Sequence, residues 1–341
     1  MSSPPSPTAA RPVLLSIVVP MFNEAEGIDE FFGVVLEVAR GVTEDFEFVC
    51  VNDGSGDDTW RRLVEWRARE PRIKIIDLAR NFGKEAAITA GLWHSSGAAV
   101  IPIDADLQDP PQLIPVLMSK WREGYDVVLA QRGDRQSDHP VKRVTAVLFY
   151  DLMRRIGDVE LPAQTGDFRL MDRRVVEAFK LLPERSRFLK GIFAWLGFRQ
   201  TFVTYSRPPR AAGKSKWTPW KLWNFALDGI VSFTTMPLRI WTYMGILVAL
   251  AAVAYIAEVI VKTLILGIDM PGYASLIVVL LFASGMNMIG FGILGEYIGR
   301  IFHEVKGRPV YLIRETSGLA IEIAPSPRPE FRGAEPGGRT P

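Results

Sequence analysis

The chain has 341 residues, enough for one large domain or two ordinary ones, and its formal net charge of +2 is too small to indicate a nucleic-acid-binding protein. Its single cysteine, Cys50, lies in the apolar run 46–51, which excludes an intramolecular disulfide and is typical of a reducing compartment. Only three histidines accompany that cysteine, so the sequence contains no cluster of the zinc-finger type.

Both ends of the chain are predicted to be disordered. Residues 1–12 are rich in Ser and Pro and contain no Lys or Arg before Arg11. Because only a short apolar run follows, we expect a disordered leader and not a secretory signal. Residues 301–341 are predicted to form a tail that is disordered from about residue 324, where Pro and Gly become frequent.

Residues 13–132 alternate between short apolar runs and amphipathic segments. The runs that predict strands are Leu14–Pro20, Phe46–Asn52, Ile73–Leu78, Ala98–Ile103 and Asp126–Gln131. The segments that predict helices are Ala25–Arg40, Asp57–Arg69, Lys84–Ser95 and Pro111–Glu123. This alternation is typical of an α/β domain with a mainly parallel sheet, and we place that domain at residues 13–215.

Polar side chains gather where these predicted strands end. Ligands bind at the carboxyl ends of the strands in such sheets. The residues expected to converge on this edge are Asn23, Glu24, Asp53, Asp104 and Asp106. No GxGxxG motif follows the first strand and no GxxxxGK[ST] motif is present, so neither a dinucleotide fold nor a P-loop is indicated.

The acids of "DADLQDPP" need a partner at the end of a buried strand, because burying an unpaired charge is costly. A cation, a helix N-terminus or a metal that carries a substrate could each serve. Hard carboxylate oxygens suit Mg²⁺ or Mn²⁺, ions that are commonly shared with substrate phosphates. Asp53 has a second interpretation, in which "NDGSGDDT" is only a turn that leads into a capped helix.

The composition changes near residue 240. The runs 240–266 and 273–298 are almost wholly apolar, and each is long enough to cross a bilayer. The alternative is a pair of buried core helices, which usually keep a polar face. Arg239, Arg300, Lys306 and Arg308 flank the pair on one side, and the connection "GIDMPG" has no Lys or Arg. The positive-inside rule then predicts a two-helix hairpin at residues 239–300 with both flanks in the cytoplasm.

The segment 216–238 interleaves aromatic and basic residues. Trp217, Trp220 and Trp223 alternate with Lys216 and Lys221, a composition that suits amphipathic helices at the membrane surface. A helix packed on the front domain is the other interpretation. In the second apolar run, a GxxxG motif at Gly295 and Gly299 suggests close helix packing and self-association of the chain.

Five motifs together resemble a known family. "VVPMFNEAEGI", "VNDGSGDDT", "NFGKEAAITAGL", "DADLQDPP" and "GDFRLMDR", in that order, resemble inverting glycosyltransferases of the GT-A type in glycosyltransferase family 2. Within that family the resemblance is to polyisoprenyl-phosphate glycosyltransferases, such as dolichol-phosphate mannose synthase and bactoprenol glucosyltransferases, and it covers about residues 16–306. The Q-x-x-R-W motif of processive synthases is missing, which favours transfer of a single sugar.

The resemblance implies roles for particular residues. The nucleotide and donor residues would be Pro20, Asn23, Glu24, Asp53, Asp104, Gln108 and Arg132. Asp104, Asp106 and Gln108 would hold Mg²⁺ or Mn²⁺, and the catalytic residues would be Asp167, Asp106 and Arg210. The acceptor phosphate would contact Arg143, Arg210, Ser215 and Lys216.

The same resemblance implies a nucleotide-sugar donor, expected to be UDP-glucose, with GDP-mannose and UDP-linked amino sugars as alternatives. The acceptor would be undecaprenyl phosphate, or dolichyl phosphate in another kind of organism, and the enzyme would be a multi-pass protein of the cytoplasmic membrane. Asp167 is either a general base, a residue that orients the acceptor, or a turn residue after Gly166. A tethered transferase with another acceptor and an inactive scaffold subunit remain as rival interpretations.

Overall fold

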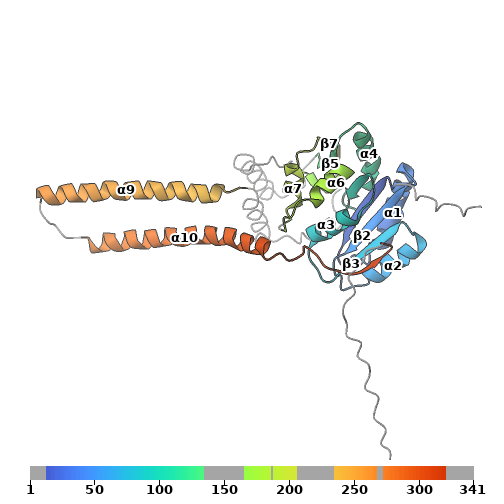
Figure 1. The fold of residues 1–341 in the computed structure, drawn as a ribbon, viewed down its shortest axis with the longest axis horizontal. Helices are drawn as coiled ribbons and strands as arrows, with labels where there is room; N and C mark the ends of the chain where they lie inside the picture. The colour runs from blue at the N-terminus through green and yellow to red at the C-terminus, as the bar shows by residue number, and fades with distance from the viewer. Residues whose placement is uncertain (1–12, 134–164, 186, 206–233, 267–271, 320–341) are drawn as a thin grey trace, which may run out of the picture.

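The computed structural model describes residues 13–133, 165–185, 187–205, 234–266 and 272–319 (Figure 1). The expected leader at 1–12, the expected interfacial helices as far as residue 233, and the expected disordered tail lie outside these ranges. The predicted acceptor residues Arg143, Arg210, Ser215 and Lys216 lie outside them as well.

A mixed, mostly parallel sheet forms the centre of the domain. Its order is β7-β5-β6-β4-β1-β2-β3-β8. The strands are β1 (Leu15–Met21), β2 (Phe46–Asn52), β3 (Ile73–Leu78), β4 (Ala99–Pro102), β5 (Val127–Arg132), β6 (Thr165–Asp172), β7 (Gln200–Tyr205) and β8 (Ile313–Ser317). β1 is parallel to β2 and β4, β2 to β3, and β5 to β7. The antiparallel members are β6, between β4 and β5, and β8 on β3.

Helices cover both faces of this sheet (Figure 1). On one face lie α1 (Ile28–Val42), α2 (Thr59–Arg69), the short η1 (Pro111–Leu113) and α4 (Ile114–Arg122). On the other lie α3 (Lys84–His94), α6 (Arg173–Lys180) and α7 (Leu189–Trp195). Every residue of β2 is buried because this strand is covered on both faces, and Cys50 is a core residue as predicted. All strands and helices expected within residues 13–132 are present.

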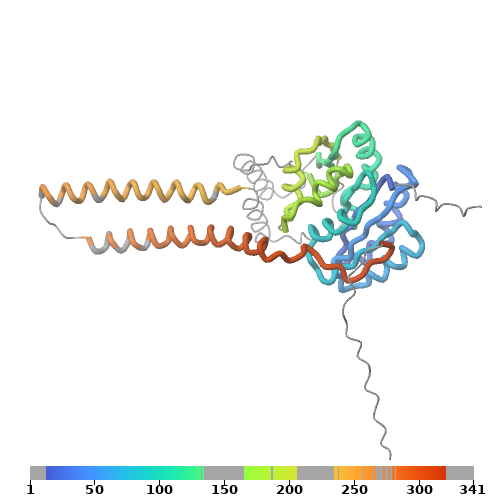
Figure 2. Tube along the Cα trace, viewed as in Figure 1, coloured from blue at the N-terminus to red at the C-terminus, as the bar shows by residue number. Residues whose placement is uncertain are grey.

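Two long helices, α9 (Met236–Leu266) and α10 (Tyr273–Val305), lie side by side and extend away from the domain (Figures 1 and 2). In α9 the stretch Leu238–Lys262 has a mean hydropathy of 2.4 and is 0% buried. It is the one stretch within the described helices that is long and apolar enough to cross a membrane. Its exposure does not fit the alternative of a buried core helix.

After α10 the chain returns to the domain, as the trace in Figure 2 shows, and adds β8 to the edge of β3. From the sequence these residues were expected to belong to the C-terminal tail, and no strand was predicted there. Ile313–Ser317, with the sequence IRETS, is short and has no sustained apolar alternation, so only its partner strand makes it recognisable.

Candidate active site

A pocket of about 290 Å³ opens at the carboxyl ends of β1, β2 and β4 and at the start of α3. Its walls include Pro20, Glu24, Asp53, Asp104 and Asp106. Four of the five residues that the sequence predicted for this edge therefore line one pocket, and they are joined by Pro20, which the family resemblance implied. The parallel arrangement of β1, β2 and β4 brings them together, since the ends of parallel strands meet at one edge.

Asn23 fixes the shape of the pocket's rim and is itself exposed. Its backbone N–H donates to Ser55 Oγ at 2.9 Å, and its side-chain oxygen accepts the N–H of Gly56 at 2.9 Å. The residue has a positive φ of 55°, which asparagine tolerates better than most residues. The loops after β1 and β2 are thus joined by hydrogen bonds through Asn23.

Asp53 holds the segment that leads into α3. The side chain is buried, and its carboxylate accepts the N–H groups of Phe82 at 2.7 Å and Gly83 at 2.9 Å. Burial raises the pKa of Asp53 above its ordinary value, although these two hydrogen bonds oppose the shift. Gly54 permits this approach, because a Cβ there would lie 2.3 Å from the carbonyl carbon of Arg80. The turn interpretation also expected an acid to cap the following helix. Asp57 does so, because its carboxylate accepts a hydrogen bond from the N–H of Thr59, the first residue of α2, at 3.1 Å.

Lys84, the first residue of α3, connects two carboxylates. Its Nζ lies 2.7 Å from Asp104 Oδ2 at the end of β4 and 2.8 Å from Asp167 Oδ2 in β6. Burial disfavours the charged ammonium, but the two carboxylates outweigh burial and raise the pKa of Lys84. Burial would also raise the pKa of Asp167, but the cations around it, Lys84 first and then Lys190 and Arg169, outweigh burial and lower it. For Asp104 burial dominates, and its pKa is raised.

Lys84 lies in the motif "NFGKEAAITAGL", but the sequence predicted no role for it. A signal was present, because Lys84 begins the helix that follows β3 and so belongs to the same edge of the sheet as the acids. What the sequence did not indicate is that one ammonium group would contact both Asp104 and Asp167.

Asp106 is exposed in the turn after β4, where its Oδ1 accepts the N–H of Gln108 at 3.1 Å. Leu107 between them has a φ of 52°. Within the described ranges no group of three or more His, Cys, Asp and Glu side chains could hold a metal. Two carboxylates nevertheless fit Mg²⁺ or Mn²⁺, which commonly take their remaining ligands from substrate phosphates and water.

Asp109, the third acid of the motif "DADLQDPP", has a structural role. It is buried, and Tyr205 at the end of β7 donates its hydroxyl hydrogen to Asp109 Oδ1 at 2.5 Å. Arg132 ends β5, and its side chain is outside what the structure describes.

Comparisons with known proteins agree with this geometry. The model of glycosyl transferase family 2 matches residues 16–179, and that of the GtrB C-terminal hairpin matches residues 236–301. The SfII prophage-derived bactoprenol glucosyl transferase of Shigella flexneri is 50% identical over 302 residues, which cover 89% of this chain and 98% of the relative. The chain belongs to glycosyl transferase family 2. The resemblance predicted from the five motifs is therefore confirmed.

Other relatives of this family 2 glycosyltransferase are similarly close. The prophage bactoprenol glucosyl transferase homolog of Escherichia coli strain K12 is 49% identical over 88% of this chain and 98% of its own. A glycosyltransferase of Synechocystis is 53% identical over 89% of this chain and 96% of its own. Among solved structures, mannosyl-3-phosphoglycerate synthase from Rubrobacter xylanophilus is 19% identical, covers 63% of this chain and 71% of its own, and has a TM-score of 0.45. The domain has the GT-A fold, with the mixed, mostly parallel sheet described above.

Proposed function

We propose that this glycosyltransferase transfers one glucose from UDP-glucose to a polyisoprenyl phosphate in the membrane, expected to be undecaprenyl phosphate, with inversion at the anomeric carbon. The main support is the similarity to bactoprenol glucosyl transferases at about 50% identity over nearly their whole length, hairpin included. The pocket at the strand ends, with its acids beside Lys84, supplies the chemistry that a nucleotide-sugar donor needs.

In this proposal the nucleotide lies against the loops after β1 and β2, where Pro20, Glu24 and Asp53 line the pocket and Asn23 joins the two loops. Asp104 and Asp106, with Gln108 beside them, would hold Mg²⁺ or Mn²⁺. A metal bound there would stabilise the negative charge that grows on the leaving diphosphate. The Asp53 carboxylate accepts the N–H groups of residues 82 and 83, which lead into α3. In this proposal the same side chain therefore positions both the nucleotide and the start of α3.

The reaction forms a bond between an acceptor phosphate oxygen and the anomeric carbon, from the face opposite the diphosphate. The bond from that carbon to the diphosphate breaks, and its electron pair leaves with UDP. A phosphate monoester has a second pKa of about 6 and is already largely ionised near neutral pH. Asp167 is therefore not needed as a strong base, and we assign it the task of orienting Lys84 and the acceptor.

Basic residues would bring the acceptor phosphate to this pocket. We propose that Arg143, Arg210 and Lys216, together with the hydroxyl of Ser215, bind the acceptor phosphate, that Arg132 binds the donor phosphates, and that Arg210 also compensates charge in the transition state. They follow from the family resemblance. Of these, only the backbone of Arg132 lies within the part of the chain that the structure describes.

We further propose that α9 and α10 cross the membrane as a hairpin, that the segment 216–238, whose last residues belong to α9, lies at its surface, and that the catalytic domain faces the cytoplasm. The apolar stretch Leu238–Lys262, exposed along its length, supports the first part of this proposal. Trp241 and Tyr297 lie at the end of the helix pair nearest the domain, as interfacial aromatics do. Arg239, Arg300, Lys306 and Arg308 lie at that end, whereas the connection 267–272 at the other end has no Lys or Arg.

The test is a transfer assay with the purified full chain in detergent, undecaprenyl phosphate, Mg²⁺ or Mn²⁺, and radiolabelled UDP-glucose, with label counted in the organic phase. GDP-mannose and UDP-N-acetylglucosamine are tested in parallel. We expect label from UDP-glucose only, and loss of it with EDTA or in Asp106→Asn. Transfer that does not require the lipid phosphate would contradict the proposed acceptor, and transfer from another donor would contradict the proposed sugar.

A further inference from the structure

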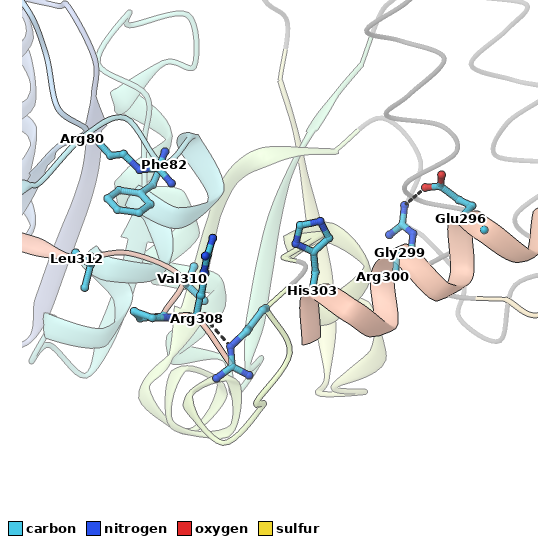
Figure 3. A pocket seen from close by; sticks show the side chains of 12 residues that line it. Arg80, Phe82, Glu296, Gly299, Arg300, His303, Arg308, Val310 and Leu312 are labelled. Carbon is cyan, nitrogen blue, oxygen red and sulfur yellow. Dashed lines mark hydrogen bonds and ion pairs between the residues drawn. The ribbon is translucent and has the colours of Figure 1, made fainter. Parts of the chain in front are cut away.

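A second and larger cavity, of about 940 Å³, lies where the domain-side end of α10 meets the catalytic domain (Figure 3). Arg80 and Phe82 line it from the segment after β3, Arg300 and His303 from α10, and Arg308 from the connection to β8. This cavity is separate from the catalytic pocket, whose walls include none of these residues.

Positive charge dominates the walls of the cavity. Arg80 lies over the ring of Phe82, with its guanidinium carbon 4.2 Å from the ring centroid. Arg300 faces Glu296 across a long ion pair of 3.6 Å, shown dashed in Figure 3, and the side chain of Arg308 is exposed. Glu296 is the one acid among the lining residues, so these three arginines leave a net positive charge even with a neutral His303.

A fourth arginine, Arg185, also lines the cavity, but its guanidinium group is already hydrogen-bonded to the backbone. Arg185 donates from Nε to the carbonyl oxygen of Arg308 at 2.7 Å and from Nη2 to that of Gly307 at 3.0 Å. Its backbone N–H donates to the carboxylate of Glu304 at 2.9 Å. The end of α10 and the connection after it are therefore held against the catalytic domain, which keeps the cavity in shape.

The position of the cavity relative to the membrane follows from the membrane hairpin of the proposed function, and this inference rests on that hairpin. Tyr297 donates its hydroxyl hydrogen to the carbonyl oxygen of Thr234 at 2.7 Å, just before α9 begins. Such a tyrosine belongs at the membrane–water interface. His303 follows it by six residues, or about 9 Å along a helix, which places the cavity among the lipid headgroups.

We propose that this cavity binds the headgroup phosphate of one anionic phospholipid of the cytoplasmic leaflet, with Arg80, Arg300 and Arg308 as its contacts. Arginine pairs well with phosphate because its guanidinium can donate two parallel hydrogen bonds. Basic pockets beside membrane helices are suited to anionic headgroups. The acyl chains would lie along the exposed apolar surface of α10, where Ile298 and Ile301 are 56% and 60% exposed.

The site shares a wall with the catalytic pocket. Arg80 and Phe82 line the lipid cavity, while Asn81, Gly83 and Lys84 line the catalytic pocket on the other side of the same segment. A lipid in the cavity therefore contacts the segment that Asp53 holds and that positions Lys84. The proposed lipid is distinct from the acceptor, which must reach the catalytic pocket itself.

Native mass spectrometry of the full chain in detergent tests the proposal, with dioleoylphosphatidylglycerol as the probe and dioleoylphosphatidylcholine and inorganic phosphate as comparisons. We expect phosphatidylglycerol to saturate at one tight adduct per chain and the two comparisons to bind far more weakly. The double variant Arg300→Gln/Arg308→Gln should weaken the phosphatidylglycerol adduct about thirtyfold. The control Arg239→Gln removes an exposed charge at the same end of the hairpin, outside the cavity, and should bind like wild type.

Three further results separate the alternatives. Arg300→Lys/Arg308→Lys should restore most of the binding, and Arg308→Gln alone, whose side chain is exposed, gives a milder test if the double variant folds poorly. Equal binding of the two lipids, or one-for-one displacement of phosphatidylglycerol by undecaprenyl phosphate, would overturn the proposal. Glucose transfer is measured separately, so an inactive wild type with arginine-dependent lipid binding would refute the proposed function and leave this inference standing.

Discussion

At the scale of single residues, Lys84 is the cation that pairs with two of the acids at the strand ends. Its ammonium group lies between Asp104 and Asp167, from strands that are neighbours in the sheet. We expect Lys84→Met to lower kcat/KM for glucose transfer by about 10² to 10³-fold, because a preorganised charge at a transition state is worth that much. The transfer assay measures the effect.

The control for that substitution is Lys120→Met, which removes a surface ion pair with Glu123 on α4 and leaves the pocket untouched. This variant should keep the wild-type rate. A Lys84→Met enzyme with more than about a third of the wild-type rate would refute a role for Lys84 in the chemistry.

Asp53 offers a second prediction at this scale. Its two carboxylate oxygens accept the backbone N–H groups of Phe82 and Gly83. Asp53→Asn replaces one acceptor by an NH₂ group that faces a donor, so one buried N–H loses its partner at a cost of about 1 to 3 kcal/mol. We expect UDP to bind at least about tenfold more weakly by calorimetry.

Asp58→Asn is the matched control, because Asp58 forms only an exposed ion pair with Arg61. It should leave UDP affinity unchanged. Equal UDP affinity in Asp53→Asn and Asp58→Asn would mean that the 80–84 segment does not depend on the Asp53 carboxylate.

At the scale of elements, the end of α2 predicts a pH dependence of stability. Glu70 is the C-cap residue of that helix. Its carboxylate accepts hydrogen bonds from Arg72 Nε and Nη2, both at 2.8 Å, and from Arg40 Nη2 at 3.0 Å. The bond from Arg72 and the Arg40 contact, opposed in part by burial, lower the pKa of Glu70 to about 2 from an ordinary 4.5. A lowered pKa contributes stability that is complete above the ordinary pKa and is lost as pH falls toward the folded value.

The free energy of unfolding should therefore fall by about 2 kcal/mol more in wild type than in Glu70→Gln between pH 5 and about pH 2.5. Denaturant titrations across that range measure it. Glu65→Gln, on the exposed side of α2, is the control and should follow wild type. Parallel curves for wild type and Glu70→Gln would contradict the assignment.

The added strand β8 makes a second element testable. Arg314 reaches from β8 to the buried carboxylate of Asp77 in β3, with Nε and Nη2 each 2.6 Å from Oδ2. Asn52 donates to the other oxygen of Asp77 at 2.7 Å. Arg314→Gln leaves a buried carboxylate without its cation, which should cost about 2 kcal/mol of unfolding free energy.

Thermal melts of Arg314→Gln and of Glu315→Gln compare this site with its exposed neighbour. Glu315→Gln should melt like wild type. If Arg314→Gln melts at the wild-type temperature as well, then β8 is held by its backbone pairing with β3 and not by the ion pair.

At the scale of the whole molecule, the helix pair is an insertion within the catalytic sheet, because β8 follows α10 and pairs with β3. A chain truncated after residue 235 loses the hairpin and β8 together. A chain in which a flexible linker of about eight residues replaces 236–305 loses only the hairpin, and that linker can span the gap because Tyr297 on α10 already contacts Thr234.

We expect the truncated chain to melt about 10 °C below the linker chain, since it loses an edge strand and the partner of Asp77. Differential scanning fluorimetry of the two proteins measures this. Equal melting temperatures would show that β8 contributes little to the stability of the domain.

Several features of this protein could be predicted from sequence because they depend on local patterns. The alternation of apolar runs and amphipathic segments predicted the strands and helices of residues 13–132. Acids at the ends of those runs predicted that their side chains would meet at one edge of the sheet, since parallel strands bring their carboxyl ends together. The continuous apolar run 240–266 predicted α9, because its composition differs from that of a helix with a polar face.

Other features were decided only by the tertiary structure, since they depend on pairs of residues far apart in the chain. Lys84 meets Asp167 across 83 positions (167 minus 84), and Arg314 meets Asp77 across 237. Periodicity and composition indicate whether a residue is buried or exposed, but they do not identify its partner. No sequence pattern therefore predicted the contacts of Lys84 with its two carboxylates or the pairing of β8 with β3. The sequence likewise did not separate Asp109 from the acids of the pocket, because its structural role depends on its buried hydrogen bond with Tyr205.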